Sequence, residues 1–146
     1  MQLLLRLQRF SSNTVSMSCK SVAENYHERI WNDKDLGAID DCLDENIVIH
    51  SALGDYRGKD GMRTIVQAWL RAFPDLYVHN QSVFCESNLV VIHWQANGTH
   101  LEEFNGKKTT RRKVAYSGVT SYRMKHNKIC EYQASLDMQD LLSQIN

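Results

Sequence analysis

The segment Leu89-Val-Val-Ile-His-Trp-Gln-Ala-Asn-Gly-Thr-His100 decides the fold, because two rows of side chains alternate along it. Residues of equal parity on a β-strand point to the same side of the sheet. One row consists of Val90, Ile92, Trp94, Ala96, Gly98 and His100. The other row becomes polar after its first two residues, with His93, Gln95, Asn97 and Thr99. The segment therefore predicts a half-buried strand whose Trp94 row faces the core.

The rest of the C-terminal half follows the same pattern. Four β-prone segments cover residues 76–86, 89–104, 112–124 and 128–136. Short polar turns separate them at residues 87–88, 105–106 and 126–127. Turns this short join neighbouring antiparallel strands. The C-terminal half therefore predicts an antiparallel meander.

Helical periodicity precedes the meander. Apolar residues recur every three to four positions over residues 22–31, and this spacing continues over 36–43. The run Ile47-Val-Ile49 predicts a strand, which a loop with Gly54, Gly58 and Gly61 follows. Residues 62–73 predict a helix that Pro74 ends. Helices followed by a meander indicate an α+β domain, with the helices packed on one face of a curved antiparallel sheet.

Length, charge and cysteine usage narrow the class of protein. A chain of 146 residues is near the commonest size of a single domain. Its formal net charge of zero argues against a nucleic-acid partner. The first apolar run, Leu3 to Leu5, is too short for a signal peptide or a membrane span. Four isolated cysteines fit small buried hydrophobes in a reducing, cytoplasmic protein.

Residues 1–21 are set apart from the domain, which we expect to cover residues 22–146. Their basic and serine-rich composition, with no acidic residue before Glu24, suits an organellar transit peptide. Met17 supports the other interpretation, in which the segment is disordered or is upstream sequence read from an early start codon. We favour the second interpretation and exclude the segment from the fold.

Two histidines stand at the ends of predicted strands. His100 closes the apolar row of its strand, and His50 follows Ile47 and Ile49 directly before the glycine-containing loop. Either imidazole could reach the wall or mouth of a cavity, and free imidazole exchanges protons near neutral pH. The alternative for His100 is a structural role at a strand end, bonded to a loop carbonyl.

Aromatic residues on the helices and on the inner strand faces predict either core or the wall of an apolar pocket. They are Trp31, Trp69, Phe73, Trp94 and Tyr116. Asp137 precedes a short segment with helical spacing. It is either the N-cap of that helix or a catalytic acid, and we favour the N-cap. The sequence has no glycine-rich phosphate loop, no HExxH zinc signature and no GxSxG elbow, so the common chemistries that such motifs carry have no support.

As an ensemble, four motifs resemble the SnoaL-like polyketide cyclases of the nuclear transport factor 2-like superfamily. They are Arg71-Ala-Phe-Pro-Asp-Leu76, the strand with Trp94 and Gly98-Thr-His100, Phe104-Asn-Gly106 and Tyr116-Ser-Gly118. The likeness covers residues 22–146 and implies a cone-shaped barrel, in which a bent antiparallel sheet and three helices enclose a pocket. In these cyclases the pocket holds a flat polycyclic ester, and an acidic side chain handles the proton of an aldol condensation without metal or cofactor.

The resemblance also assigns positions to individual residues. Trp31 and His50 match pocket positions of the family, and Trp94 and His100 match its motif tryptophan and Gly-Thr-His histidine. Thr120 stands where the cyclases carry a pocket histidine. Ala134 occupies the position of their catalytic aspartate. Asp137 matches a second aspartate, three residues further on, and cannot simply take over that role. Because alanine carries no proton, the resemblance makes polyketide cyclisation itself unexpected.

We therefore expect a protein that binds a small, mostly apolar, carbonyl-bearing ligand. Cofactor-free isomerisation, cyclisation or hydrolysis is the expected chemistry, with His50 and His100 exchanging protons. The expected ligand-contacting residues are Trp31, Trp69, Trp94, Tyr116, Thr120, Ala134 and Asp137. The alternative is a non-catalytic binding or assembly module of the same fold. A homodimer is expected in either case.

Overall fold

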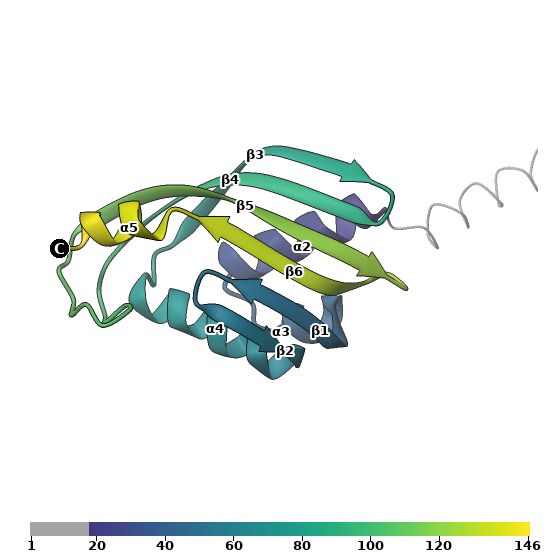
Figure 1. The fold of residues 1–146 in the computed structure, drawn as a ribbon, viewed down its shortest axis with the longest axis horizontal. Helices are drawn as coiled ribbons and strands as arrows, with labels where there is room; N and C mark the ends of the chain where they lie inside the picture. Colours follow the sequence, from purple (N-terminus) through teal and green to yellow (C-terminus); the bar gives the residue numbers. More distant parts are fainter. Residues whose placement is uncertain (1–17) are drawn as a thin grey trace, which may run out of the picture.

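A single six-stranded sheet forms the centre of the protein (Figure 1). The structure is a computed structural model, and it describes residues 18–146. The order of the strands across the sheet is β2-β1-β6-β5-β4-β3. Their bounds are β1 Leu43–Ser51, β2 Gly54–Arg57, β3 Tyr77–Glu86, β4 Leu89–Thr99, β5 Lys113–Lys125 and β6 Lys128–Leu136.

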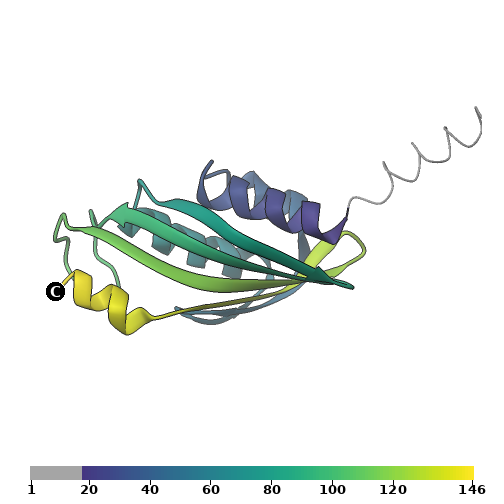
Figure 2. The same ribbon diagram turned by 90° about the horizontal axis from the view of Figure 1, so that it is seen from above.

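Three helices cover one side of the bent sheet. The described residues contain four helices in all, α2 (Cys19–Trp31), α3 (Gly37–Cys42), α4 (Gly58–Ala72) and α5 (Met138–Gln144). Figure 2 shows α2, α3 and α4 on the same side of the strands, with the short α5 on the other side at the C-terminal end. The α+β class and the curved sheet under N-terminal helices are confirmed. The edge strands β2 and β3 do not pair, so the barrel stays open.

The pairing of the strands adds one feature that the sequence pattern did not predict. The segments β3 to β6 form the expected antiparallel meander, and β1 and β2 form an antiparallel hairpin. The hairpin joins the meander through a parallel contact between β1 and β6, with Ile49 opposite Tyr132. Parallel pairing needs a long connection between the strands, and here the rest of the domain supplies it.

The inner face of the sheet agrees with the alternation seen in the sequence. Along β4 the even-numbered residues from Val90 to Gly98 are buried, whereas the odd-numbered ones are partly or fully exposed. Tyr26 and Ile30 of α2 and Ile65 of α4 are buried against this face. Burial of each such side chain contributes about 1.5–3 kcal/mol relative to exposure. The apolar stripes of the helices and the inner face of the sheet therefore form one core.

The glycine-containing segment differs from the predicted loop. Gly54 begins β2 with a φ of 126°, and Gly58 begins α4 with a φ of 76°, both in the left-handed region that favours glycine. The strand predicted to reach Phe104 also ends earlier, at Thr99, whose amide donates to the Asp75 carboxylate at 2.7 Å. Residues 100–112 form a loop instead of a tight turn.

The first described helix begins slightly before residue 22, where the helical spacing in the sequence was expected to start. Helix α2 starts at Cys19, and the Ser18 hydroxyl caps it by accepting a hydrogen bond from the Ser21 amide at 3.1 Å. The predictions for residues 1–17 lie outside the described residues. Within residues 18–146, no helix is long and apolar enough to cross a membrane. The expectation of buried cysteines is correct for Cys42 and wrong for Cys85, which is exposed on the edge strand β3.

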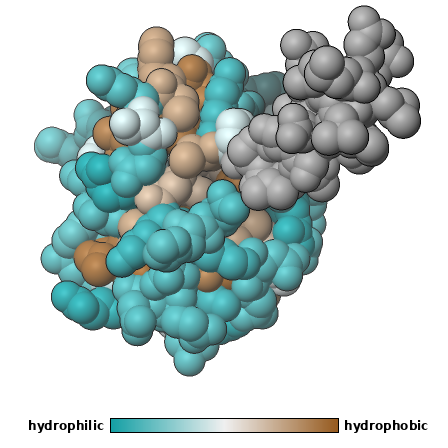
Figure 3. Space-filling view, turned by 90° about the vertical axis from the view of Figure 1, so that its right-hand side faces the viewer, coloured by the Kyte–Doolittle hydropathy of each residue, from teal (hydrophilic) through white to brown (hydrophobic). Residues whose placement is uncertain are grey.

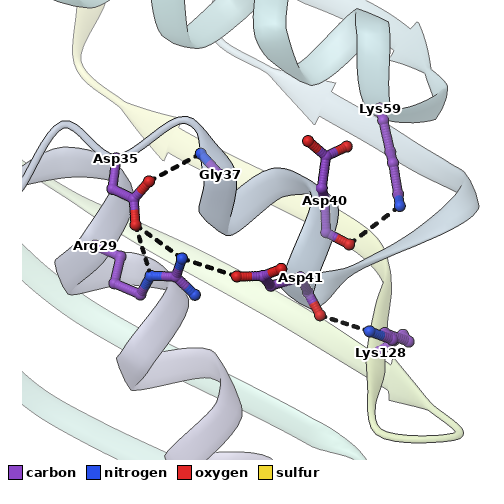
Figure 4. Close-up of polar contacts among 7 residues, drawn as sticks. All are labelled: Arg29, Asp35, Gly37, Asp40, Asp41, Lys59 and Lys128. Atoms are coloured by element: carbon purple, nitrogen blue, oxygen red, sulfur yellow. Dashed lines mark hydrogen bonds and ion pairs between the residues drawn. The ribbon is translucent and has the colours of Figure 1, made fainter.

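A network of ion pairs and hydrogen bonds connects α2, α3 and α4 (Figure 4). The Arg29 guanidinium donates to Asp35 at 2.7 Å and to Asp41 at 2.9 Å. The hydrogen bond from Arg29 lowers the pKa of Asp35. Lys59 of α4 donates to the carbonyl of Asp40, and Lys128 of β6 donates to the carbonyl of Asp41. Short α3 is therefore held by neighbours on three elements.

Most of the surface at the end where α2 begins is hydrophilic, with an apolar strip across its upper and middle part (Figure 3). Among the described residues, the large hydrophobic side chains that remain exposed are Tyr77, Phe84 and Leu101. Tyr77 and Phe84 both belong to the edge strand β3. An edge strand with apolar side chains is a surface on which another chain can pair.

Candidate ligand-binding site

A narrow cavity lies between the helices and the inner face of the sheet. The wall comes from α2, α4 and five of the strands with their connecting turns, and it is mostly apolar. All three tryptophans of the protein, Trp31, Trp69 and Trp94, contribute to it. The cavity has a free volume of about 30 Å³, enough for about two water molecules. A larger ligand must therefore displace side chains at its mouth.

The mouth lies where β1 and β6 end. Four residues of the wall are partly exposed, namely Ser51, Ala52, Ala134 and Leu136. The tryptophans, by contrast, are at most 8% exposed. Because β1 and β6 run parallel, their C-terminal ends meet at the same edge of the sheet, and the small side chains there leave a gap.

Trp94 is fixed in the wall by a hydrogen bond and by a glycine. Its indole N–H donates to the Thr120 hydroxyl at 2.9 Å, a contact buried between β4 and β5. Gly118 is the cross-strand partner of Trp94, and a Cβ at Gly118 would lie 2.5 Å from the indole ring. The glycine therefore gives the indole room to reach Thr120.

Trp69 and Tyr116 form the other side of the wall with stacked rings, and Phe104 packs on Trp69 behind it. The ring of Trp69 lies 5.8 Å from Tyr116 and 4.7 Å from Phe104. Tyr116 also contacts Trp94 edge to face at 5.8 Å. Aromatic pairs at these separations are stabilising and rigid. The wall therefore offers flat apolar surfaces, which suit a flat apolar ligand.

The sequence analysis missed three polar residues of the wall, namely Ser51, Tyr132 and His27. Of these, His27 is the most deeply buried and the one with an unpaired atom. It lies on the buried stripe of α2, four residues after Ala23 and four before Trp31. Its Nδ1 lies 2.6 Å from the Tyr122 hydroxyl, whereas Nε2 has no hydrogen-bond partner within residues 18–146. Burial lowers the pKa of His27 to about 4. The sequence signal that could have indicated His27 is a polar residue on the otherwise apolar stripe of the helix.

The cavity wall is electrically neutral near pH 7. No aspartate or glutamate of the described chain lines it. Burial raises the pKa of Tyr116 and of Tyr132, so both phenols keep their protons. With its lowered pKa, His27 is uncharged as well. The wall therefore offers neutral hydrogen-bond donors and acceptors rather than fixed charges.

Six of the predicted ligand-contacting residues lie around this cavity. They are Trp31, Trp69, Trp94, Tyr116, Thr120 and Ala134. The structure brings them together from α2, α4, β4, β5 and β6. Their role in binding stays a prediction, because the geometry places them without showing what they bind.

His50 does not point into the cavity as the sequence analysis expected. The side chain is 46% exposed, and its Nδ1 pairs with the Asp55 carboxylate at 3.0 Å across the β1–β2 hairpin. The physical reason is strand parity, since Ile47 and Ile49 face the core and His50 takes the opposite face. The expected placement at the wall is therefore corrected.

His100 is fully buried, but it lies outside the cavity wall. Its Nδ1 accepts the amide hydrogen of Thr110 at 3.2 Å, and its backbone carbonyl accepts from the Thr109 hydroxyl. The amide of Arg111 donates to the same carbonyl. The ring and backbone of His100 thus organise the loop at 100–112, which corrects the expected position at the cavity. The structural role at a strand end agrees with the alternative interpretation, but the ring contacts the amide and hydroxyl of Thr110 instead of a loop carbonyl.

Asp137 also lies away from the cavity. Its carboxylate accepts a hydrogen bond from the Asp140 amide at 3.0 Å and caps the N-terminus of α5. The N-cap interpretation is therefore confirmed, and the expected ligand contact is not part of the wall. Within residues 18–146, no group of three or more His, Cys, Asp or Glu side chains is arranged to hold a metal ion.

Comparison with solved structures finds the same fold in bacterial proteins. AclR from Streptomyces galilaeus, a candidate hydroxylase, is 26% identical, with a TM-score of 0.77 over 87% of this chain and 94% of that one. A candidate polyketide cyclase from Acidithiobacillus ferrooxidans is 23% identical, with a TM-score of 0.76 over 89% and 96% of the two chains. TsrD from Streptomyces laurentii is 16% identical, with a TM-score of 0.80 over 90% and 97%.

No curated protein matches the sequence. The family described as SnoaL-like polyketide cyclase matches residues 21–145, which is nearly the whole of the described chain. This agrees with the open, curved sheet and the three covering helices. The chain therefore belongs to the SnoaL-like polyketide cyclase family.

Proposed function

We propose that the protein binds a small, mostly apolar carbonyl compound in the cavity between α2, α4 and the sheet. The observation that carries this proposal is the composition of the wall, in which three tryptophans and Tyr116 surround few polar groups. Cavities of this kind, apolar with a small number of placed polar atoms, hold small ligands. Membership of the SnoaL-like family supports the same ligand class.

We further propose that the bound carbonyl compound undergoes cofactor-free isomerisation, cyclisation or hydrolysis. All three reactions begin with polarisation of the carbonyl oxygen, which neutral donors in a dry cavity favour. Ala134 lines the wall, and the resemblance to the cyclases assigns it the position of their catalytic aspartate, so the proposal includes no acid at this position. His50 and His100 lie outside the wall, and the proposal assigns neither to direct contact with the ligand.

The binding step is tested with 1-indanone, a small, flat ketone that suits a narrow cavity. Because all three tryptophans line the cavity, their indole N–H signals in ¹⁵N NMR report on it directly. We expect saturable shifts of these signals. Ala134→Phe should fill the mouth and raise the Kd about tenfold or more. Ser135→Phe, on the exposed side of the same strand, is the matched control and should bind like the wild type.

Equal binding by the Ala134→Phe and wild-type proteins, or shifts that never saturate, would overturn the proposed site. The chemical step is measured separately, as deuterium uptake at the carbon next to the carbonyl of 1-indanone in D₂O. We expect the wild type to accelerate this exchange relative to Ala134→Phe. Binding without faster exchange would leave a binding protein and remove the proposed reaction.

A further inference from the structure

His27 carries the unexplained polar atom of the cavity. The side chain is 3% exposed and belongs to the wall. Nδ1 is engaged by the Tyr122 hydroxyl, so Nε2 is the ring nitrogen left without a partner among the described residues. Buried polar atoms are nearly always paired, and an unpaired one lowers stability. An unpaired atom on a residue that lines a cavity is therefore a candidate contact for a ligand.

The contact with Tyr122 determines which ring nitrogen carries the proton. Burial raises the pKa of Tyr122 well above its usual value, so the phenol keeps its hydrogen. Nδ1 of His27 is the hydrogen-bond partner of this hydroxyl among the described residues, and a buried hydroxyl hydrogen is nearly always paired, so we assign the phenol as the donor and Nδ1 as the acceptor. A neutral imidazole that accepts at Nδ1 has its hydrogen on Nε2. The unpaired Nε2 is thus a donor.

We propose that the Nε2–H group of His27 donates a hydrogen bond to the carbonyl oxygen of the bound ligand. This inference rests on the proposed function and names the residue that selects the ligand's polar atom. The wall contains no carboxylate, so an ammonium or guanidinium ligand would find no counter-charge there. A donor in an apolar cavity selects ligands with an acceptor oxygen, such as ketones and esters.

The same geometry suits a carbonyl oxygen that becomes more negative during a reaction. The Tyr122 hydroxyl and the His27 ring form a chain of two hydrogen bonds that ends at the ligand, and such chains strengthen as the terminal acceptor gains charge. Tyr122 is itself held edge to face by Tyr26 and Tyr132. The donor is therefore positioned before the ligand arrives, which is the condition for electrostatic stabilisation of an enol-like state.

The test compares 1-indanone with indane, which has the same shape but no carbonyl group. Both are titrated against the wild type and His27→Phe, again by the indole N–H signals. We expect His27→Phe to weaken 1-indanone binding about tenfold while indane binds as before. The infrared carbonyl stretch of ¹³C-labelled 1-indanone should move to lower frequency in the wild type and return toward its value in an apolar solvent in the variant.

Two further variants control for folding and for general effects. His27→Phe leaves the Tyr122 hydroxyl unpaired, so the double variant His27→Phe with Tyr122→Phe removes both partners and restores an apolar contact. It should show the same loss of preference for the ketone. His93→Phe replaces an exposed histidine of β4, outside the wall, and should keep the preference of the wild type.

The outcomes separate the two proposals. If 1-indanone and indane bind equally and His27→Phe changes neither affinity nor the carbonyl stretch, the role of His27 is overturned while the binding site stands. If neither compound binds the wild type, the proposed function fails. In that case ¹⁵N NMR of histidine-labelled protein still decides the inference, because a ring hydrogen on Nδ1 of His27 would contradict the donor assignment.

Discussion

At the scale of single residues, the missing side chain of Gly118 shapes the cavity as much as the rings that line it. The Trp94 indole lies across Gly118, and an added Cβ would also meet the carbonyl oxygen of Ser135 at 2.6 Å. Neither neighbour can yield cheaply, because one is a large ring in a buried hydrogen bond and the other is backbone. The pairing of β4 with β5 places Trp94 opposite Gly118, and this position lets the indole N–H reach the Thr120 hydroxyl.

His27 gives the protein a pH-dependent stability. The folded state lowers the pKa of this histidine to about 4, whereas the unfolded chain has a value near 6.5. Below pH 6.5 the unfolded state binds the proton more readily, so stability is complete above that pH and is lost as the pH falls toward 4. We predict that the free energy of unfolding decreases by about 2 kcal/mol between pH 7 and pH 4.5 through this residue.

Urea unfolding at the two pH values measures this effect. His27→Gln cannot titrate, so its decrease should be smaller than that of the wild type by about the same 2 kcal/mol. The carboxylates contribute equally to both proteins and cancel in the comparison. An identical pH dependence of the wild type and the variant would show that burial does not hold His27 neutral.

At the scale of secondary-structure elements, the short helix α3 depends on ion pairs with its neighbours for its stability. Helix α3 has only six residues and no side-chain cap, so its own hydrogen bonds do not make it stable. Arg29 of α2 binds Asp35 before it and Asp41 within it, as Figure 4 shows. Arg63 of α4 pairs with Asp40 at the other side. The position of α3 therefore comes from its neighbours.

We predict that Arg29→Met lowers the unfolding temperature, because two carboxylates lose their shared partner. The difference from the wild type should shrink in about 1 M NaCl, where the Debye length is about 3 Å. Arg123→Met is the matched control, since Arg123 makes one exposed pair with Glu131 at 3.8 Å, and such pairs contribute little. Differential scanning calorimetry at both salt concentrations checks this, and an equal effect of the two variants would contradict it.

At the scale of the whole molecule, the sheet leaves its edge strand β3 available for contact with another chain. Tyr77 and Phe84 on this strand are 45% and 60% exposed, an unusual position for large apolar side chains. We predict that two copies associate in solution and that light scattering gives about twice the chain mass of 16.9 kDa. Phe84→Glu should shift the equilibrium toward single chains, while Ser87→Glu in the adjacent exposed turn should not. A mass near that of one chain for the wild type would reject the prediction.

Much of the fold followed from local patterns in the sequence. The alternation in β4 predicted its buried face, the helical spacing predicted α2 and α4, and the short turns predicted the meander. These signals are local because side-chain periodicity reports the face that a single element buries. The SnoaL-like resemblance in the motifs was confirmed by the family match.

The contacts between side chains from distant parts of the sequence could be known only from the tertiary structure. The parallel contact of β1 with β6 joins segments from the two halves of the chain, and it places the cavity mouth between them. The same packing turned His50 outward to Asp55 and enclosed His100 in its loop. The sequence did not predict a role for His27, because the role of one polar residue on an apolar stripe depends on its hydrogen-bond partner. Its partner Tyr122 is 95 residues away, and only folding brings the two together.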